Sequence, residues 1–250
     1  MASCSFIFGT DAEQPPVQPK STERAPARPA QAEPEKSVVP HPDSRAGFEF
    51  PQDIFKEENQ CYRADLRTPH IGIAAIDEHI SNWENDFYEN AAAELNANCE
   101  RGGQGYYILL DYETSATLGR VVSVLFNYSL YRGGAHPENV TLSMVFDIAD
   151  GRLLGIDDIF AQPEGLAQFL SDFTYTALKP ALGGIWEDTP SFMDGFSPNL
   201  SNFSTFVMGQ EGLTLVFPTY QIAPYASGVQ SCTVPLRELL RFMPRPGMWQ

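Results

Sequence analysis

Apolar and polar residues alternate along two segments near the middle of the chain. The apolar positions are Val122, Val124, Phe126, Tyr128 and Leu130 in the first segment, and Val140, Leu142, Met144, Phe146 and Ile148 in the second. A period of two puts each set on one face of a β-strand. Most of the alternate positions are polar: Ser123, Asn127 and Ser129 in the first segment, and Thr141, Ser143 and Asp147 in the second. We therefore expect two antiparallel strands with one buried and one wet face.

Apolar residues recur at spacings of three and four in two other segments. The first set is Ile73, Ile76, Ile80, Trp83, Phe87, Ala91 and Leu95, and the second is Leu166, Phe169, Leu170, Phe173 and Ala177. This spacing predicts two amphipathic helices. The second helix should begin near Pro163 and end before Pro180 and the Gly183-Gly184 pair.

Shorter runs complete the expected secondary structure. Strands are expected over 61–69, from 106 onward, and over 203–209, 212–218 and 229–235, with a turn at 149–152, a long loop at 186–202 and a terminal helix at 236–242. Strands and helices come in blocks, without strict alternation. The pattern favours an α+β fold in two layers, with helices packed on one face of antiparallel sheet. The folded domain should span 52–250, either whole or as subdomains of about 52–132 and 133–250.

The first fifty residues have a different composition. Residues 11–51 are rich in proline and poor in aromatic residues, which predicts a disordered, extended linker. Residues 1–10 begin MASCSF, which resembles the end of a bacterial lipoprotein signal whose hydrophobic core is missing. The pattern predicts lipid attachment at Cys4, and its alternative is a chance cysteine.

The charge balance excludes one class of partner. The chain has 16 basic and 32 acidic residues, a formal net charge of −16. Five of the basic and seven of the acidic residues precede residue 50, so 11 basic and 25 acidic residues remain in the folded part. Nucleic acid binding needs clustered Lys and Arg, so we expect no nucleic acid partner. A net negative charge attracts basic partners. The alternative is that the acidic residues only keep the protein soluble.

Four cysteines are present, and none has metal-binding spacing. In an oxidising envelope, Cys61 and Cys99 could form a disulfide across the first helix, with Cys232 left as a buried thiol. Other pairings remain open, because connectivity does not follow from sequence.

Three phrases occur in an order that resembles a known family: YRGGAHPENV at 131–140, MVFDIADGRLLGIDDIF at 144–160, and the stretch at 206–239 that contains YQIAPYASG. Over about 61–242 the chain resembles the domain of unknown function found in RsiV-type anti-sigma factors and beside the deacetylase of PdaC-like proteins. The resemblance implies an envelope-facing binding domain, which in RsiV-type proteins senses lysozyme. No membrane span, anti-sigma segment or deacetylase domain is recognisable here, so we do not carry those activities over.

Three segments contain residue types that occur in catalytic or metal sites. His136 lies in a Gly-Gly-Ala-His-Pro turn, and no second histidine follows at the spacing of a metal-binding motif such as H-x-x-x-H. This favours a role in shaping the loop or in binding. Asp111 and Glu113 share a strand face and could form a carboxylate pair, but solvated acidic faces commonly offer such pairs. The segment at 147–158 departs from a calcium loop, because Ala149 stands where an oxygen ligand is needed. We predict no metal and no cofactor.

The sequence thus favours a noncatalytic binding module, tethered by lipid at the periplasmic face or outer membrane of a bacterial envelope. Its ligand would be peptidoglycan or a basic protein such as lysozyme, and the membrane would be contacted only through the anchor. The candidate binding residues are Tyr131, Gly133, Gly134, His136, Pro137, Tyr220, Pro224 and Tyr225. The alternatives are a peptidoglycan hydrolase using His136 or Asp111 and Glu113, and a structural lipoprotein without a soluble ligand.

Overall fold

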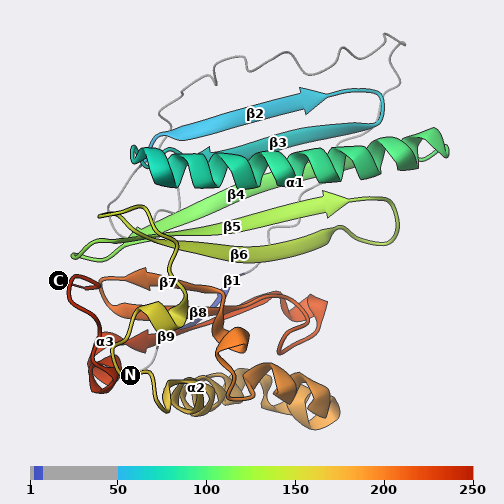
Figure 1. Ribbon diagram of the computed structural model, residues 1–250. Coiled ribbons are helices and arrows are strands. Elements are labelled where there is room, and N and C mark those ends of the chain that lie inside the picture. The colour runs from blue at the N-terminus through green and yellow to red at the C-terminus, as the bar shows by residue number, and fades with distance from the viewer. Residues whose placement is uncertain (1–2, 8–49, 250) are drawn as a thin grey trace.

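The computed structural model describes the backbone of residues 3–7 and 50–249, and the side chains of residues 50–249. Two sheets, each covered by a helix, are stacked along the molecule (Figure 1). The five-stranded sheet has the order β2-β3-β4-β5-β6, and the four-stranded sheet has the order β1-β9-β8-β7. All pairs but one are antiparallel, so the expected α+β class is confirmed.

The five-stranded sheet comprises β2 (Gln52–Glu58), β3 (Tyr62–Pro69), β4 (Tyr106–Ala116), β5 (Val121–Tyr131) and β6 (Glu138–Asp147), and helix α1 (Ala74–Glu100) lies across it. The two alternating segments form β5 and β6 as predicted. Strands β3 and β4 are parallel, because α1 carries the chain back to the same end of the sheet. Strand β2 was not predicted, because its apolar residues Ile54 and Phe55 are adjacent and do not alternate.

The four-stranded sheet comprises β1 (Ser3–Ile7), β7 (Phe206–Gly209), β8 (Gly212–Phe217) and β9 (Val229–Pro235). Helix α2 (Leu166–Asp188) covers it, and α3 (Leu236–Leu239) follows β9. The short 3₁₀ helices are η1 (Ile156–Asp158), η2 (Pro190–Phe196), η3 (Leu200–Phe203), η4 (Tyr225–Ser227) and η5 (Leu240–Phe242). Much of the segment expected as a long loop is therefore helical.

Helix α2 is longer than the sequence predicts. It continues through Pro180 and both glycines to Asp188. Leu178, Leu182 and Trp186 extend the buried stripe at four-residue spacing, and the Trp186 Nε1–H donates to the Ile222 carbonyl at 2.9 Å. Pro180 lies on the exposed face, where water can hydrate the carbonyl that loses its helical partner. Packing thus outweighs the local helix-breaking signals.

Serine side chains of the five-stranded sheet form hydrogen bonds with backbone groups of β7, the edge strand of the other sheet. Ser123 Oγ accepts a hydrogen bond from the Met208 N–H at 2.9 Å, and Ser143 Oγ accepts one from the Phe206 N–H at 2.9 Å. Ser115 donates to the Met208 carbonyl at 2.9 Å. An edge strand presents unpaired backbone groups, and these three serines pair some of them. They therefore join the two sheets.

This junction corrects the expectation of a wet sheet face. Ser123 is 0% exposed and Asp147 is 2% exposed. Asp147 is paired with Arg120 at 2.9 Å and accepts a hydrogen bond from the Ala149 N–H. Alternation identified the two faces of each strand, but the second sheet covers part of the face that carries the polar residues.

Replacing Ser123 with alanine should lower the free energy of unfolding by about 1–3 kcal/mol, since the buried Met208 N–H would lose its acceptor. Urea unfolding measures this change. Ser129→Ala, at a half-buried serine on the same strand face, is the control and should cost less. Equal losses in both variants would contradict the role assigned to Ser123.

The expected disulfide between Cys61 and Cys99 is present and joins the segment before β3 to the end of α1. Cys232 is buried in β9. The predicted linker lies outside the described residues apart from its last two, and so does the side chain of Cys4. Among the described residues, no helix is both long and apolar enough to cross a bilayer.

Candidate functional site

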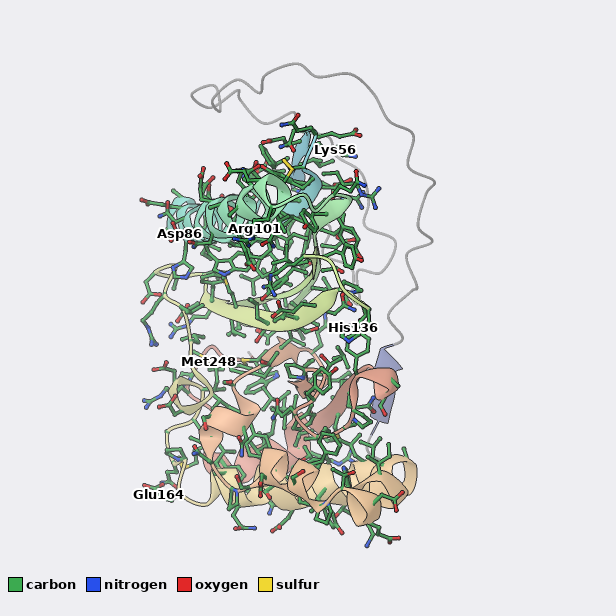
Figure 2. The ribbon with its side chains drawn as sticks, turned by 90° about the vertical axis from the view of Figure 1, so that its right-hand side faces the viewer. Lys56, Asp86, Arg101, His136, Glu164 and Met248 are labelled. Carbon is green, nitrogen blue, oxygen red and sulfur yellow. A yellow bond between two sulfur atoms is a disulfide. The ribbon has the colours of Figure 1, made fainter. Side chains whose placement is uncertain are left out.

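Two loops that are distant in sequence meet beside the junction of the sheets. The β5–β6 loop (residues 132–137) and the β8–β9 loop (residues 218–228) enclose a hollow of about 380 Å³, here called the first hollow. Its lining consists of Leu130, Arg132, Gly133, His136, Pro137, Glu138, Asn139, Val140, Pro218, Thr219, Tyr220 and Tyr225. Figure 2 places His136 at this junction.

The β5–β6 loop owes its shape to its two glycines. Gly133 and Gly134 have φ angles of 89° and 112°, a region that side-chain-bearing residues rarely adopt. The Tyr131 hydroxyl donates to the Gly134 carbonyl at 3.0 Å, which closes the turn. The turn expected from the Gly-Gly pair is therefore present.

The β8–β9 loop contributes a strained tyrosine to the opposite wall. Tyr220 has a φ angle of 71°, uncommon for a residue other than glycine, and its side chain is exposed. Its N–H donates to the Ala223 carbonyl at 3.0 Å. Such backbone strain persists only where surrounding contacts maintain it, and it occurs often at functional sites.

His136 and Tyr225 bring the two loops together. Their rings stack with centroids 4.4 Å apart and an interplanar angle of 25°. The Asn139 amide donates to the Tyr225 hydroxyl at 2.6 Å, and that hydroxyl donates to the Pro137 carbonyl at 3.5 Å. His136 Nδ1 lies 2.8 Å from the same carbonyl. The stacked pair is therefore held by contacts from both loops.

Arg132 is the cation of the site. Its guanidinium lies 3.1 Å from Glu94 of α1 and 2.5 Å from Glu138. Burial, and after it the negative charge of Glu138, raises the pKa of the Tyr128 hydroxyl, so this phenol stays neutral. The site thus combines aromatic surfaces with one arginine that lies between two carboxylates.

A second hollow of about 400 Å³ lies between α1 and strands β5 and β6. It is lined by Trp83, Asp86, Phe87, Asn90, Ala91, Glu94, Tyr128, Leu130, Arg132 and Leu142. Leu130 and Arg132 line both hollows, so the two are adjacent at this pair of residues.

The structure brings most of the predicted binding residues together. Five of them line the first hollow: Gly133, His136, Pro137, Tyr220 and Tyr225. Tyr131 and Gly134 shape the same loop, and Pro224 is the N-cap residue of η4. Sequence reasoning did not single out Arg132 and Glu138, whose only signal was their position beside the Gly-Gly turn. Trp83 and Phe87 were expected on the apolar face of the first helix, and in the structure both are half-buried and line the second hollow.

The residues considered for catalysis do not assemble. Asp111 lies 3.8 Å from Arg67, and neither Asp111 nor Glu113 lines either hollow. A catalytic histidine is usually oriented by a carboxylate or activates a nearby nucleophile. The Nδ1 atom of His136 instead meets a backbone carbonyl, and its ring stacks on a tyrosine. Among the described residues, no group of three His, Cys, Asp or Glu side chains could hold a metal ion. The arrangement suits binding better than bond cleavage.

Comparisons with solved structures place the fold. A member of the DUF3298 family from Bacteroides fragilis has a TM-score of 0.54 and 19% identity, covering 78% of this chain and 94% of its own. A DUF3298 family protein from Pseudomonas aeruginosa has a TM-score of 0.56 and 16% identity, covering 80% and 96% respectively. At these identities the likeness concerns the fold alone.

Sequence comparisons agree with the PdaC-like resemblance. The peptidoglycan-N-acetylmuramic acid deacetylase PdaC of Bacillus subtilis is 32% identical over 125 residues, which is 50% of this chain and 27% of PdaC. The model of a family described as "Protein of unknown function (DUF3298)" matches residues 157–237, a range that includes the β8–β9 loop but not the β5–β6 loop. Residues 157–237 therefore match the model of a family of unknown function, and half of the chain is similar to about a quarter of PdaC.

Proposed function

We propose that this chain is a noncatalytic binding module of the bacterial cell envelope, and that the first hollow receives a cell-wall ligand. Two observations support an extracytoplasmic location. The homologous protein PdaC is named for an activity on peptidoglycan, and the Cys61–Cys99 disulfide is of a kind that persists in oxidising compartments. Lipid attachment at Cys4 stays a prediction from the sequence.

The observation that carries the proposal is the stack of His136 on Tyr225 at the wall of the first hollow. Tyrosines supply large contact area with few rotatable bonds, so little conformational entropy is lost when they bind. Here the phenol is also held by Asn139 before any ligand arrives. A preorganised aromatic surface lowers the cost of binding.

The size and polarity of the hollow suit a fragment of a glycan. Its volume of about 380 Å³ lies within the range of small-molecule sites, roughly 300–1,000 Å³. Sugar rings have apolar faces that can pack on aromatic rings, and hydroxyls that can bond to groups such as those of Asn139 and Thr219. We therefore favour a peptidoglycan glycan strand as the ligand.

Replacing Tyr225 with alanine should weaken binding to purified peptidoglycan about tenfold or more, because the aromatic wall and its contact with His136 would be lost. Co-sedimentation of the protein with cell-wall sacculi measures the change. Tyr175→Ala, at a half-buried tyrosine on α2, is the matched control and should retain binding if it is folded. Equal binding by wild type and Tyr225→Ala would contradict this assignment of the site.

A basic protein such as lysozyme is the second candidate ligand. The folded part has 25 acidic and 11 basic residues, a balance that would speed association with a basic partner. Calorimetry with lysozyme at low salt tests this partner, and no measurable heat would exclude it. Release of soluble fragments from cell-wall material, lost on alanine substitution of His136 or of Asp111 and Glu113, would favour a hydrolase instead.

A further inference from the structure

The two hollows adjoin at Arg132. Both are lined by Arg132 and Leu130, near the end of β5, and they open toward different elements. The first hollow lies against the β8–β9 loop, whereas the second lies against α1. A ligand that occupied both would have to be elongated, because each hollow alone has the volume of a small-molecule site.

Aromatic rings line the path in both hollows. In the second hollow, Trp83 and Phe87 are stacked with centroids 5.8 Å apart, and Phe87 lies 4.7 Å from Tyr128. In the first hollow, Tyr225 is stacked on His136. Ring-shaped ligand units could therefore pack at successive positions along one strand.

The charges along the path are predominantly negative. Asp86, Glu94 and Glu138 contribute three carboxylates, whereas Arg132 is the one Lys or Arg among the lining residues of the two hollows. Arg132 is already paired with two of these carboxylates. An anionic ligand would thus meet a net repulsive field, whereas a cationic ligand would be attracted.

We propose that the two hollows form one elongated site for a glycan strand that carries free, protonated amino groups. This inference rests on the proposed function and specifies its ligand class. Such strands arise when the acetyl groups of N-acetylated amino sugars are removed by hydrolysis: the amide C–N bond breaks, water supplies the hydroxyl of the released acetate, and the sugar nitrogen becomes an amine. The module would therefore bind the product of an N-deacetylation reaction.

The preference for a protonated amine over an acetamide follows from charge. A protonated amine can form charge-assisted hydrogen bonds with Asp86, Glu94 or Glu138, whereas a neutral acetamide cannot. Each contact is exposed and worth little alone, but several amines on one strand meet several carboxylates. The preference for the amine form should therefore exceed that expected from any single pair.

Calorimetry with two oligosaccharides of equal length provides the test. The probes are a glucosamine hexamer and its fully N-acetylated counterpart, titrated into the full chain. We expect the amine form to bind about tenfold more tightly at a pH where it is protonated. This preference should fall as the salt concentration rises and as the pH passes the pKa of the amines.

Matched variants on α1 locate the effect. Asp86→Asn should reduce the affinity for the amine form about two- to threefold and leave the acetylated form unchanged. Glu78→Gln, at an exposed carboxylate of the same helix outside both hollows, should change neither affinity. Equal effects of the two variants would overturn the assignment of Asp86, because only a general charge effect would then remain.

The remaining outcomes separate this inference from the proposed function. If both oligosaccharides bind equally and Tyr225→Ala abolishes both, the glycan-binding function holds and the amine preference is wrong. If neither oligosaccharide binds, the inference fails; binding to intact sacculi that is lost in Tyr225→Ala would then still support the proposed function. If lysozyme alone binds, both glycan proposals are wrong.

Discussion

Replacing Phe126 with alanine is expected to lower the free energy of unfolding by about 3–5 kcal/mol, the usual cost of removing a buried phenylalanine ring. Phe126 is 0% exposed and lies at the centre of β5. Its ring is 4.7 Å from that of Trp83, so it supports α1 on the five-stranded sheet. The cavity would be bounded by strands on both sides, Tyr112 on β4 and Leu142 on β6, which limits its collapse. Urea unfolding measures the loss.

The control for this substitution is Leu118→Ala. Leu118 lies in the turn between β4 and β5 and is 72% exposed, so its removal should change the stability by no more than about 0.5 kcal/mol. A loss as large as that of Phe126→Ala would show that the packing described for β5 does not determine stability. Because Trp83 also lines the second hollow, Phe126→Ala should weaken glycan binding there as well.

Removing the disulfide by the double substitution Cys61→Ser and Cys99→Ser should cost about 3–4 kcal/mol. The two cysteines are 38 residues apart, and a cross-link over such a loop mainly reduces the entropy of the unfolded chain. Both cysteines are replaced together so that no unpaired thiol is left at this position. Thermal and urea unfolding of the oxidised proteins measure the difference.

Reductant supplies the control for the disulfide. The wild type should lose a similar amount of stability when it is reduced, whereas the double variant should respond much less. If the reductant destabilises both proteins equally, the Cys61–Cys99 bond does not carry the effect. The bond holds the end of α1, so the variant should also lose affinity at the second hollow, to which this helix contributes Asp86 and Glu94.

Elements whose signal is local in the sequence were predicted correctly, whereas elements that depend on distant contacts were not. The period of two in β5 and β6 and the apolar stripe of α1 arise because one face of each element is buried. The sequence therefore predicted all three elements. The end of α2 was misplaced, because Pro180 and the glycines are local signals and the packing of Trp186 is not. Strand β2 was missed, since its stability comes from pairing with β3 and its own pattern is weak.

The candidate site shows the same division. Gly133, Gly134 and Pro137 identified a tight loop, because φ preferences are intrinsic to these residues. Nothing in the sequence indicated that this loop would lie against the β8–β9 loop, or that His136 would stack on Tyr225 across 89 positions. Glu94 joins Arg132 only because α1 crosses the sheet close to the end of β5.

By itself, the sequence determined the α+β class, the faces of α1, β5 and β6, and the backbone of the Gly-Gly loop. These features depend on periodicity and on the conformational limits of single residues, which act over a few positions. Only the tertiary structure decided that serines would pair with β7, that two loops would share a hollow, and that a second hollow would adjoin it at Arg132. Those contacts depend on the packing of one sheet against another, and that packing minimises unpaired buried groups over the whole chain.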